Sequence, residues 1–211
     1  RALASVATYI FNGKNLRESL IANKNAPKSS RDSGKNTFPA MLAAGEKLWP
    51  YRFSGYWRDV GTITSLWDAN MDMLSTTLIN LYDPSWPIYS RSPVCPPHYT
   101  GEGSSVIHSI ISEGCEIYGR VENSVLSPSV KIGKGATVLY SVLMPGAVVE
   151  DGATVEYAII GERTVIHPRA HVGAEPDGSE TWGVATCGPD IEIKEGAAVP
   201  AGAMVYTGEE V

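Results

Sequence analysis

The sequence predicts an α/β segment followed by a left-handed parallel β-helix of hexapeptide repeats. From Ser124 to Ala174 the chain reads as three consecutive blocks of 17 residues, in which large aliphatic side chains recur every five or six positions. Up to about residue 80, strand-type and helix-type patterns alternate, which is typical of an α/β domain. The 211 residues include 21 Gly and 14 Pro, and such a turn-rich composition favours a β-type fold over a helical bundle.

The first region, residues 1–80, contains helix and strand signals in alternation. Residues 4–11 are β-prone and predict a strand. Further elements are a short helix capped by Asn15 and running through Leu20, a polar loop at 29–36, a helix at 37–44 ended by Gly45, and a strand at 48–53. Thr62 is placed to cap another helix, because the apolar residues from Ile63 to Leu74 follow helical spacing.

The second region, residues 81–104, is predicted to be a proline-rich linker. It carries little periodicity and five prolines, namely Pro84, Pro87, Pro93, Pro96 and Pro97. Such a composition favours an extended connection over a packed element. The linker separates the α/β region from the β-helix, which we expect to occupy residues 105–211.

Within the third region, each step of the repeat supplies one large and one smaller residue at positions i and i−2. The large residues are Ile132, Val138, Leu143, Val149, Val155, Ile160, Ile166 and Val172, and the smaller ones are Val130, Ala136, Ser141, Ala147, Ala153, Ala158, Thr164 and Ala170. Residues i and i−2 of a strand point the same way, so both face inward. Three steps make one coil of a hexapeptide β-helix. Residues 174–190 break the step and are predicted to loop out of one coil.

Composition excludes several classes of protein. The formal net charge is −6, and without a block of Lys or Arg the chain lacks the basic surface that nucleic-acid binding requires. Cys95, Cys115 and Cys187 form no CxxC pair, which favours a reduced, cytoplasmic protein over a disulfide scaffold or zinc site. No apolar run is long enough to span a membrane. The chain opens without Met or a signal peptide, close to an apolar strand, so we expect a piece of a longer protein.

The segment FSGYWRDVGT, residues 53–62, is the best candidate for chemistry. It places Asp59 after the aromatic pair Tyr56 and Trp57 and before Gly61. A carboxylate beside a glycine at the end of a strand suits a metal ion or a substrate hydroxyl. The alternative is a strand-to-helix turn in which Asp59 binds only backbone donors. Taken alone, the residues favour this second interpretation.

Four segments of the chain match a known family, namely ASVATYIF, SSRDSGKNTFP, FSGYWRDVGTITSLWDANMDML and WPIYSRSPVCPP. In this order along the chain, they resemble bacterial ADP-glucose pyrophosphorylases, also called glucose-1-phosphate adenylyltransferases. The resemblance covers essentially the whole chain. It implies that residues 1–80 are the C-terminal remnant of a Rossmann-like nucleotidyltransferase domain whose N-terminal nucleotide-binding part is missing. It also implies a reaction for the parent, in which ATP and glucose 1-phosphate give ADP-glucose and pyrophosphate for glycogen synthesis.

The resemblance also implies roles for individual residues. Asp59 corresponds to a catalytic residue of the family and to one of two carboxylates that hold Mg²⁺, the other lying upstream of Arg1. The residues that correspond to the glucose 1-phosphate pocket are Ser5, Tyr9, Asp32 and Trp57. These types are suitable, since hydroxyls and carboxylates hydrogen-bond sugar hydroxyls and an indole packs on a sugar face.

The sequence departs from the family in two places. Ser33 and Asn36 replace a Phe and an Asp of the sugar loop, which weakens the assignment of Asp32. The glycine-rich loop that cradles ATP, and the phosphate-binding Lys strand, do not occur here. We therefore predict that this chain alone does not make ADP-glucose. The resemblance further implies regulation by small anionic effectors, and either a homotetramer or a hetero-oligomer with a companion subunit.

Three alternatives stay open. A non-catalytic regulatory or assembly subunit of the same family is favoured by Ser33 and Asn36 and disfavoured by the retained Asp59. A hexapeptide acyltransferase would use a histidine as general base, but no acyl-CoA signal accompanies the histidines of the repeat region. A nucleotidyltransferase for another base or sugar is the nearest rival. The cations near the motifs, Lys35, Arg52 and Arg58, are interpreted as solvated surface charges.

Overall fold

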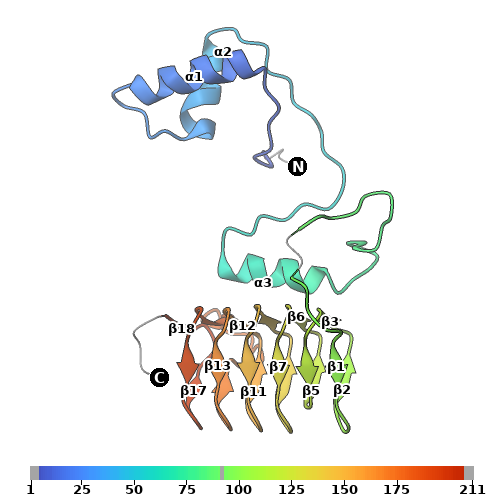
Figure 1. Ribbon diagram of the computed structural model, residues 1–211. Coiled ribbons are helices and arrows are strands. Elements are labelled where there is room, and N and C mark those ends of the chain that lie inside the picture. The colour runs from blue at the N-terminus through green and yellow to red at the C-terminus, as the bar shows by residue number, and fades with distance from the viewer. Residues whose placement is uncertain (1–4, 91–92, 207–211) are drawn as a thin grey trace. The chain divides into compact units, whose positions relative to one another are not determined.

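The computed structural model describes residues 5–90 and 93–206, and the chain divides into two compact units. The first unit is Arg1–Trp57 and the second is Arg58–Val211. The helix that Thr62 was predicted to cap therefore belongs to the same unit as the β-helix, although its sequence texture matches the first region (Figure 1). Each unit is described by itself.

In the first unit, three short helical elements follow one another. They are α1 (Gly13–Asn25), the single π turn η1 (Ser33–Thr37) and α2 (Phe38–Ala43). The N-cap of α1 is Asn12, whose side-chain oxygen accepts the Lys14 N–H at 3.0 Å. The prediction of Asn15 as the cap was wrong, because Asn12 has the extended backbone and the side-chain bond that a cap requires. The helix predicted at 37–44 is confirmed as α2.

The strands predicted at 4–11 and 48–53 do not form in the described residues, and residue 4 lies outside them. A strand needs a neighbour to complete its backbone hydrogen bonds, and no strand occurs among residues 5–57. Every second residue of the second segment exposes an aromatic ring, with Trp49 86%, Tyr51 88% and Phe53 52% exposed. The period-two pattern of a strand is therefore present without a sheet for it to join.

The second unit contains a β-helix of three six-stranded parallel sheets (Figure 1). The first sheet contains β1 (Tyr99–Thr100), β4 (Glu116–Ile117), β7 (Lys131–Ile132), β10 (Val148–Val149), β13 (Val165–Ile166) and β16 (Glu192–Ile193). The second contains β2 (Ser105–Ile107), β5 (Arg120–Glu122), β8 (Thr137–Leu139), β11 (Thr154–Glu156), β14 (His171–Val172) and β17 (Ala198–Val199). The third contains β3 (Ile110–Ile111), β6 (Val125–Leu126), β9 (Val142–Leu143), β12 (Ala158–Ile160), β15 (Ala185–Cys187) and β18 (Met204–Val205).

The sequence repeat sets the register between coils. Val148 pairs with Val165, and Thr137 with Thr154, so within the three repeat blocks neighbours in a sheet are 17 residues apart. All eight large and all eight smaller residues predicted to face inward are at most 1% exposed. The left-handed parallel β-helix of hexapeptide repeats is thus confirmed, and its core is the inside of the coil.

A ladder of serines runs through one corner of this core. The Ser141 hydroxyl donates to the Leu139 carbonyl at 2.7 Å and accepts the Ala158 N–H at 3.2 Å. The Ser124 hydroxyl does the same one coil earlier, donating to Glu122 and accepting the Ser141 N–H. Both serines are fully buried. The hydroxyls therefore supply hydrogen bonds between coils where the strand ladder is interrupted at a corner.

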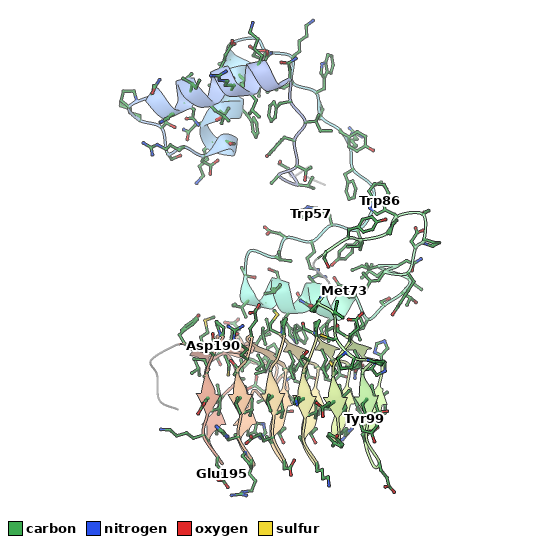
Figure 2. All side chains as sticks on the ribbon, in the orientation of Figure 1. Trp57, Met73, Trp86, Tyr99, Asp190 and Glu195 are labelled. Carbon is green, nitrogen blue, oxygen red and sulfur yellow. The ribbon has the colours of Figure 1, made fainter. Side chains whose placement is uncertain are left out.

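The corners also contain left-handed residues that are not glycine. His108, Asn123, Tyr140 and Tyr157 occupy one corner of successive coils with φ between 45° and 47°. At other corners, arginines in this conformation pair with acidic residues of the next coil. Arg163 binds both oxygens of Asp190, at 2.6 and 2.7 Å, and Arg169 pairs with Glu195. In Figure 2, Asp190 is labelled near the upper ends of the drawn strands and Glu195 near their lower ends.

The interruption predicted at 174–190 is shorter than expected. Residues 185–187 form β15, which pairs with β12 on one side and β18 on the other. Cys187 occupies the inward position that Leu143 and Ile160 hold in earlier coils, and it is 1% exposed. The excursion between β14 and β15 therefore ends before Ala185, because an inward apolar residue restores the coil.

Helix α3 (Ile63–Asp72) packs on the third sheet, as Figure 1 shows. Its apolar residues pack against a buried cluster formed by Val142, Ile159 and Val184; they are Ile63, Leu66, Trp67 and Met71. The Trp67 Nε1–H donates to the Tyr140 carbonyl at 2.7 Å. Thr62 caps the helix as predicted. Among the described residues, no helix has the length and apolar character that crossing a bilayer requires.

Candidate functional site

Asp59 lies in an exposed turn at the start of the second unit. Its Oδ1 accepts the Gly61 N–H at 3.0 Å, which is the backbone contact that the turn interpretation predicts. Its Oδ2 accepts no hydrogen bond from any residue that the structure describes. One oxygen thus holds the turn, and the other is available for a ligand.

The turn runs directly into α3. Thr62 Oγ1 accepts the Ser65 N–H at 3.2 Å, and the Thr62 N–H donates to Ser65 Oγ at 3.1 Å. This reciprocal capping box satisfies backbone donors at the helix N-terminus. Asp59 is therefore three residues from a fixed helix end.

Arg58 is not the solvated surface charge that the sequence suggested. Its Nη1 contacts Asp68 Oδ2 at 2.9 Å and its Nη2 contacts Asp72 Oδ2 at 2.7 Å. Spacing along the helix was the only part of this contact that the sequence displayed. Asp68 and Asp72 are four residues apart and therefore share one face of α3. The other two cations, Lys35 and Arg52, are exposed.

Ser5 and Tyr9, predicted sugar-pocket residues, lie together in the first unit. Ser5 Oγ and the Tyr9 hydroxyl are 2.8 Å apart. The Tyr9 ring lies 4.3 Å from the Phe38 ring, centroid to centroid, and Phe38 begins α2. Tyr9 is 44% exposed. Two hydroxyls thus form one exposed polar group beside an aromatic cluster.

Asp32 holds the turn that precedes α2. It is the N-cap of η1, and its Oδ1 accepts the Lys35 N–H at 2.8 Å. Asn36 Oδ1 accepts the Ser30 hydroxyl at 2.7 Å and the Asp32 N–H at 3.3 Å. An aspartate at position 36 would accept the same two bonds, so the substitution to Asn preserves the hydrogen bonding of this loop. Ser33, the other departure, is the exposed first residue of η1.

Trp57, the last residue of the first unit, is 49% exposed. The structure therefore brings Ser5 and Tyr9 together and joins them through Phe38 to the turn that Asp32 caps. Trp57 and Asp59 fall on the two sides of the division between the units. Their assignment to one pocket stays a prediction.

The residues present fit a magnesium ion only in part. Carboxylate oxygens are the ligands that Mg²⁺ prefers, and Asp59 offers one such oxygen. Among the described residues, no three His, Cys, Asp or Glu side chains gather as a metal site. The role of Asp59 as a ligand of Mg²⁺ therefore stays a prediction.

The histidines of the β-helix pair with acidic residues or an amide on neighbouring coils. His167 Nδ1 lies 2.9 Å from Glu150 Oε2 and its Nε2 lies 3.5 Å from Glu192 Oε2. The hydrogen bond that His167 donates to Glu150 is the main reason that the pKa of His167 is raised above its ordinary value. His171 pairs with Glu156 at 2.8 Å, and His108 with Asn123 at 2.8 Å. These contacts crosslink coils.

Comparisons with known proteins match both regions of the chain. Residues 1–76 match the family model described as "Nucleotidyl transferase", and residues 97–187 match "GlmU-like, C-terminal hexapeptide". A glucose-1-phosphate adenylyltransferase of Desulforamulus reducens is 40% identical over 208 residues, which is 96% of this chain and 50% of that protein.

Relatives of the same printed name are more similar over shorter stretches. The Acetivibrio thermocellus protein is 50% identical over 140 residues, covering 66% of this chain and 33% of its own length. The Clostridium novyi protein is 46% identical over 136 residues, covering 64% and 36%. The chain thus spans at most about half the length of these relatives. In domain order and in sequence, the chain belongs to the glucose-1-phosphate adenylyltransferase family, as a nucleotidyl transferase segment followed by a hexapeptide β-helix.

Proposed function

We propose that this chain is the sugar-phosphate side and the β-helix of an enzyme that makes ADP-glucose and pyrophosphate from ATP and glucose 1-phosphate, for glycogen synthesis in the cytoplasm. The observation that carries this proposal is the 40% identity to the Desulforamulus reducens relative across 208 residues. The FSGYWRDVGT segment adds a carboxylate with one available oxygen, which suits the catalytic role.

Asp59 is the catalytic residue and metal ligand of the proposed enzyme. Its Oδ2 would hold Mg²⁺ together with a second carboxylate from the part of the protein outside this sequence. Bound Mg²⁺ offsets negative charge on the nucleotide phosphates. The Gly61 N–H donates to Oδ1 at 3.0 Å, which restrains the carboxylate and leaves Oδ2 as the ligand oxygen.

Glucose 1-phosphate is bound by the first unit. Ser5 and Tyr9 present paired hydroxyls 2.8 Å apart, which donate to and accept from sugar hydroxyls. Asp32 adds a second acceptor, because the Lys35 N–H donates to its Oδ1 and leaves its Oδ2 for a sugar hydroxyl. The exposed indole of Trp57 supplies a flat apolar surface for a sugar face.

The assembled enzyme is proposed to be a homotetramer, or a hetero-oligomer with a companion subunit, and to respond to small anionic effectors. This chain alone is proposed to be inactive, because the ATP-binding loop of the resembled family is absent from its sequence.

The test is pyrophosphate release by the full-length protein containing this chain, with ATP, glucose 1-phosphate and Mg²⁺. Asp59→Asn is compared with Asp83→Asn, a matched control whose Oδ1 accepts the Ser85 N–H at 2.8 Å in the same kind of turn. We expect Asp59→Asn to reduce the rate by about two orders of magnitude or more, since a metal ligand supports several kcal/mol of charge stabilisation. Asp83→Asn should leave the rate unchanged.

Each result has a clear meaning. If the full-length protein is inactive, the catalytic proposal is wrong, and the alternative of a non-catalytic regulatory subunit is favoured. An active protein that tolerates Asp59→Asn keeps the enzyme and removes Asp59 from its mechanism. Release of ADP-glucose by this chain alone would overturn the proposed need for the missing part.

A further inference from the structure

Arg58 anchors the turn that contains Asp59 to two points on α3. The guanidinium contacts Asp68 through Nη1 at 2.9 Å and Asp72 through Nη2 at 2.7 Å. The Asp72 side chain is only 19% exposed and the Arg58 side chain 35%, so solvent screens this contact less than a fully exposed pair. Because Asp68 and Asp72 bind two different nitrogens of Arg58, they restrict the orientation of the planar guanidinium as well as its position.

The other end of the same short turn is also fixed. The Thr62–Ser65 capping box joins residue 62 to the first turn of α3 through two hydrogen bonds between their backbones and side chains. Only Asp59, Val60 and Gly61 lie between the Arg58 anchor and this cap. The backbone of Asp59 is therefore held from both sides, and the bond to the Gly61 N–H then orients its carboxylate.

The helix that receives both anchors is itself fixed to the β-helix. Leu66, Trp67 and Met71 pack on the third sheet, and the Trp67 indole donates to the Tyr140 carbonyl at 2.7 Å. The Trp67 ring also lies 6.0 Å from the Tyr157 ring, centroid to centroid. Figure 2 labels Met73, the C-cap of α3, over the β-helix. Helix α3 thus presents acidic residues to Arg58 and apolar residues to the coil.

We propose that Arg58 is a positioning residue for Asp59, and that α3 is the rigid link by which the β-helix holds the metal-binding carboxylate in place. This inference rests on the proposed role of Asp59 as a metal ligand. Arg58 does not touch the reacting atoms. Its contribution is to restrict the carboxylate to one orientation, as partners of metal ligands do in other metal sites.

The test compares Arg58→Ala and Arg58→Lys with Arg163→Ala in the full-length protein. Arg163 is a matched control, because it also binds two carboxylate oxygens at 2.6 and 2.7 Å, but at a β-helix corner paired with Asp190. We expect Arg58→Ala to lower kcat and to raise the Mg²⁺ concentration for half-maximal rate, each by about 10- to 100-fold. Arg58→Lys keeps the positive charge but not the planar guanidinium that binds two carboxylates, so its effects on kcat and on the Mg²⁺ requirement should be intermediate.

The KM for glucose 1-phosphate should stay close to wild type in Arg58→Ala, since no sugar contact is removed. Arg163→Ala should change none of the three quantities. If Arg58→Ala behaves like Arg163→Ala, the proposal is overturned. Asp59→Asn in the same assay separates the two claims, because its retention of activity would refute the role of Asp59 itself.

A second measurement needs no activity. Amide hydrogen exchange should accelerate about 10-fold in Arg58→Ala at Gly61 and Thr62, whose N–H groups donate to Asp59 Oδ1 and Ser65 Oγ, because the turn loses one of its two anchors. Exchange in the β-helix strands should stay as in wild type, which shows that the variant folds. Equal exchange of Gly61 and Thr62 in Arg58→Ala and Arg163→Ala would overturn the proposal.

Discussion

Replacing Ser141 by Ala separates two accounts of the β-helix core. In the repeat pattern, Ser141 is one of the smaller inward residues, and Ala occupies the matching position in most other steps. The pattern therefore predicts a neutral substitution. The structure predicts a cost, because the buried hydroxyl is the hydrogen-bond acceptor of the Ala158 N–H on the next coil, at 3.2 Å.

The size of the cost follows from which groups lose their partners. The Leu139 carbonyl, which accepts the Ser141 hydroxyl, also accepts the Tyr157 N–H at 3.0 Å and stays satisfied. The Ala158 N–H loses the Ser141 hydroxyl as its acceptor, and Ala158 is fully buried. One orphaned backbone donor costs about 1–3 kcal/mol. We expect Ser141→Ala to lower the free energy of unfolding by that amount.

The assay is guanidinium unfolding of this chain followed by far-ultraviolet circular dichroism. The control is Ser127→Ala, since the Ser127 hydroxyl is half-buried and makes no hydrogen bond with a described residue. The control should change the unfolding free energy by less than about 0.5 kcal/mol, and the slope m should be the same for both variants. If Ser141→Ala matches the control, the serine ladder contributes nothing, and the corner requires only a small side chain.

Two further predictions concern contacts between distant parts of the second unit. The raised pKa of His167 means that its pairing with Glu150 and Glu192 stabilises the fold below the unfolded pKa of about 6.5. That stabilisation is lost as the pH rises through the higher pKa of the folded state. The difference in thermal midpoint between wild type and His167→Gln should therefore shrink between about pH 6 and pH 8. A difference that stays constant over this range contradicts the prediction. Trp67→Phe removes the indole donor to Tyr140 and should cost about 1 kcal/mol in chemical unfolding, with an unchanged free energy contradicting the docking of α3.

Local patterns were sufficient for the repeating part of the fold. Inward residues such as Leu143 and Ile160 recur at fixed steps, and each short strand needs only its own coil and the next to be specified. The cap at Thr62 was also predictable, because a capping hydroxyl bonds backbone groups within three residues. The cap predicted at Asn15 was wrong. Asn12 is another capping residue three positions earlier, and the sequence pattern did not show which of the two asparagines caps the helix.

The candidate site could be proposed only as a list of residues, through the resemblance of short motifs, and that list stays a prediction. The contacts that support the site could not be predicted. Arg58 was interpreted as a surface charge because the sequence shows that Asp68 and Asp72 share a helix face, but does not show that this face meets an arginine ten residues before Asp68. The two strands expected in the first unit did not form, because strand propensity requires a neighbouring strand that the described residues do not supply.

The sequence by itself determined the β-helix, the positions of its inward residues, the helix start at Thr62 and the family to which the motifs belong. These depend on periods and caps that operate within one coil or one helical turn. Only the tertiary structure decided that α3 packs on the third sheet, that Arg58 joins the Asp59 turn to that helix, and that buried serines connect the coils. Those contacts join residues 10, 17 or 73 positions apart, and the energy of such a contact depends on burial and geometry that exist only after the chain has folded.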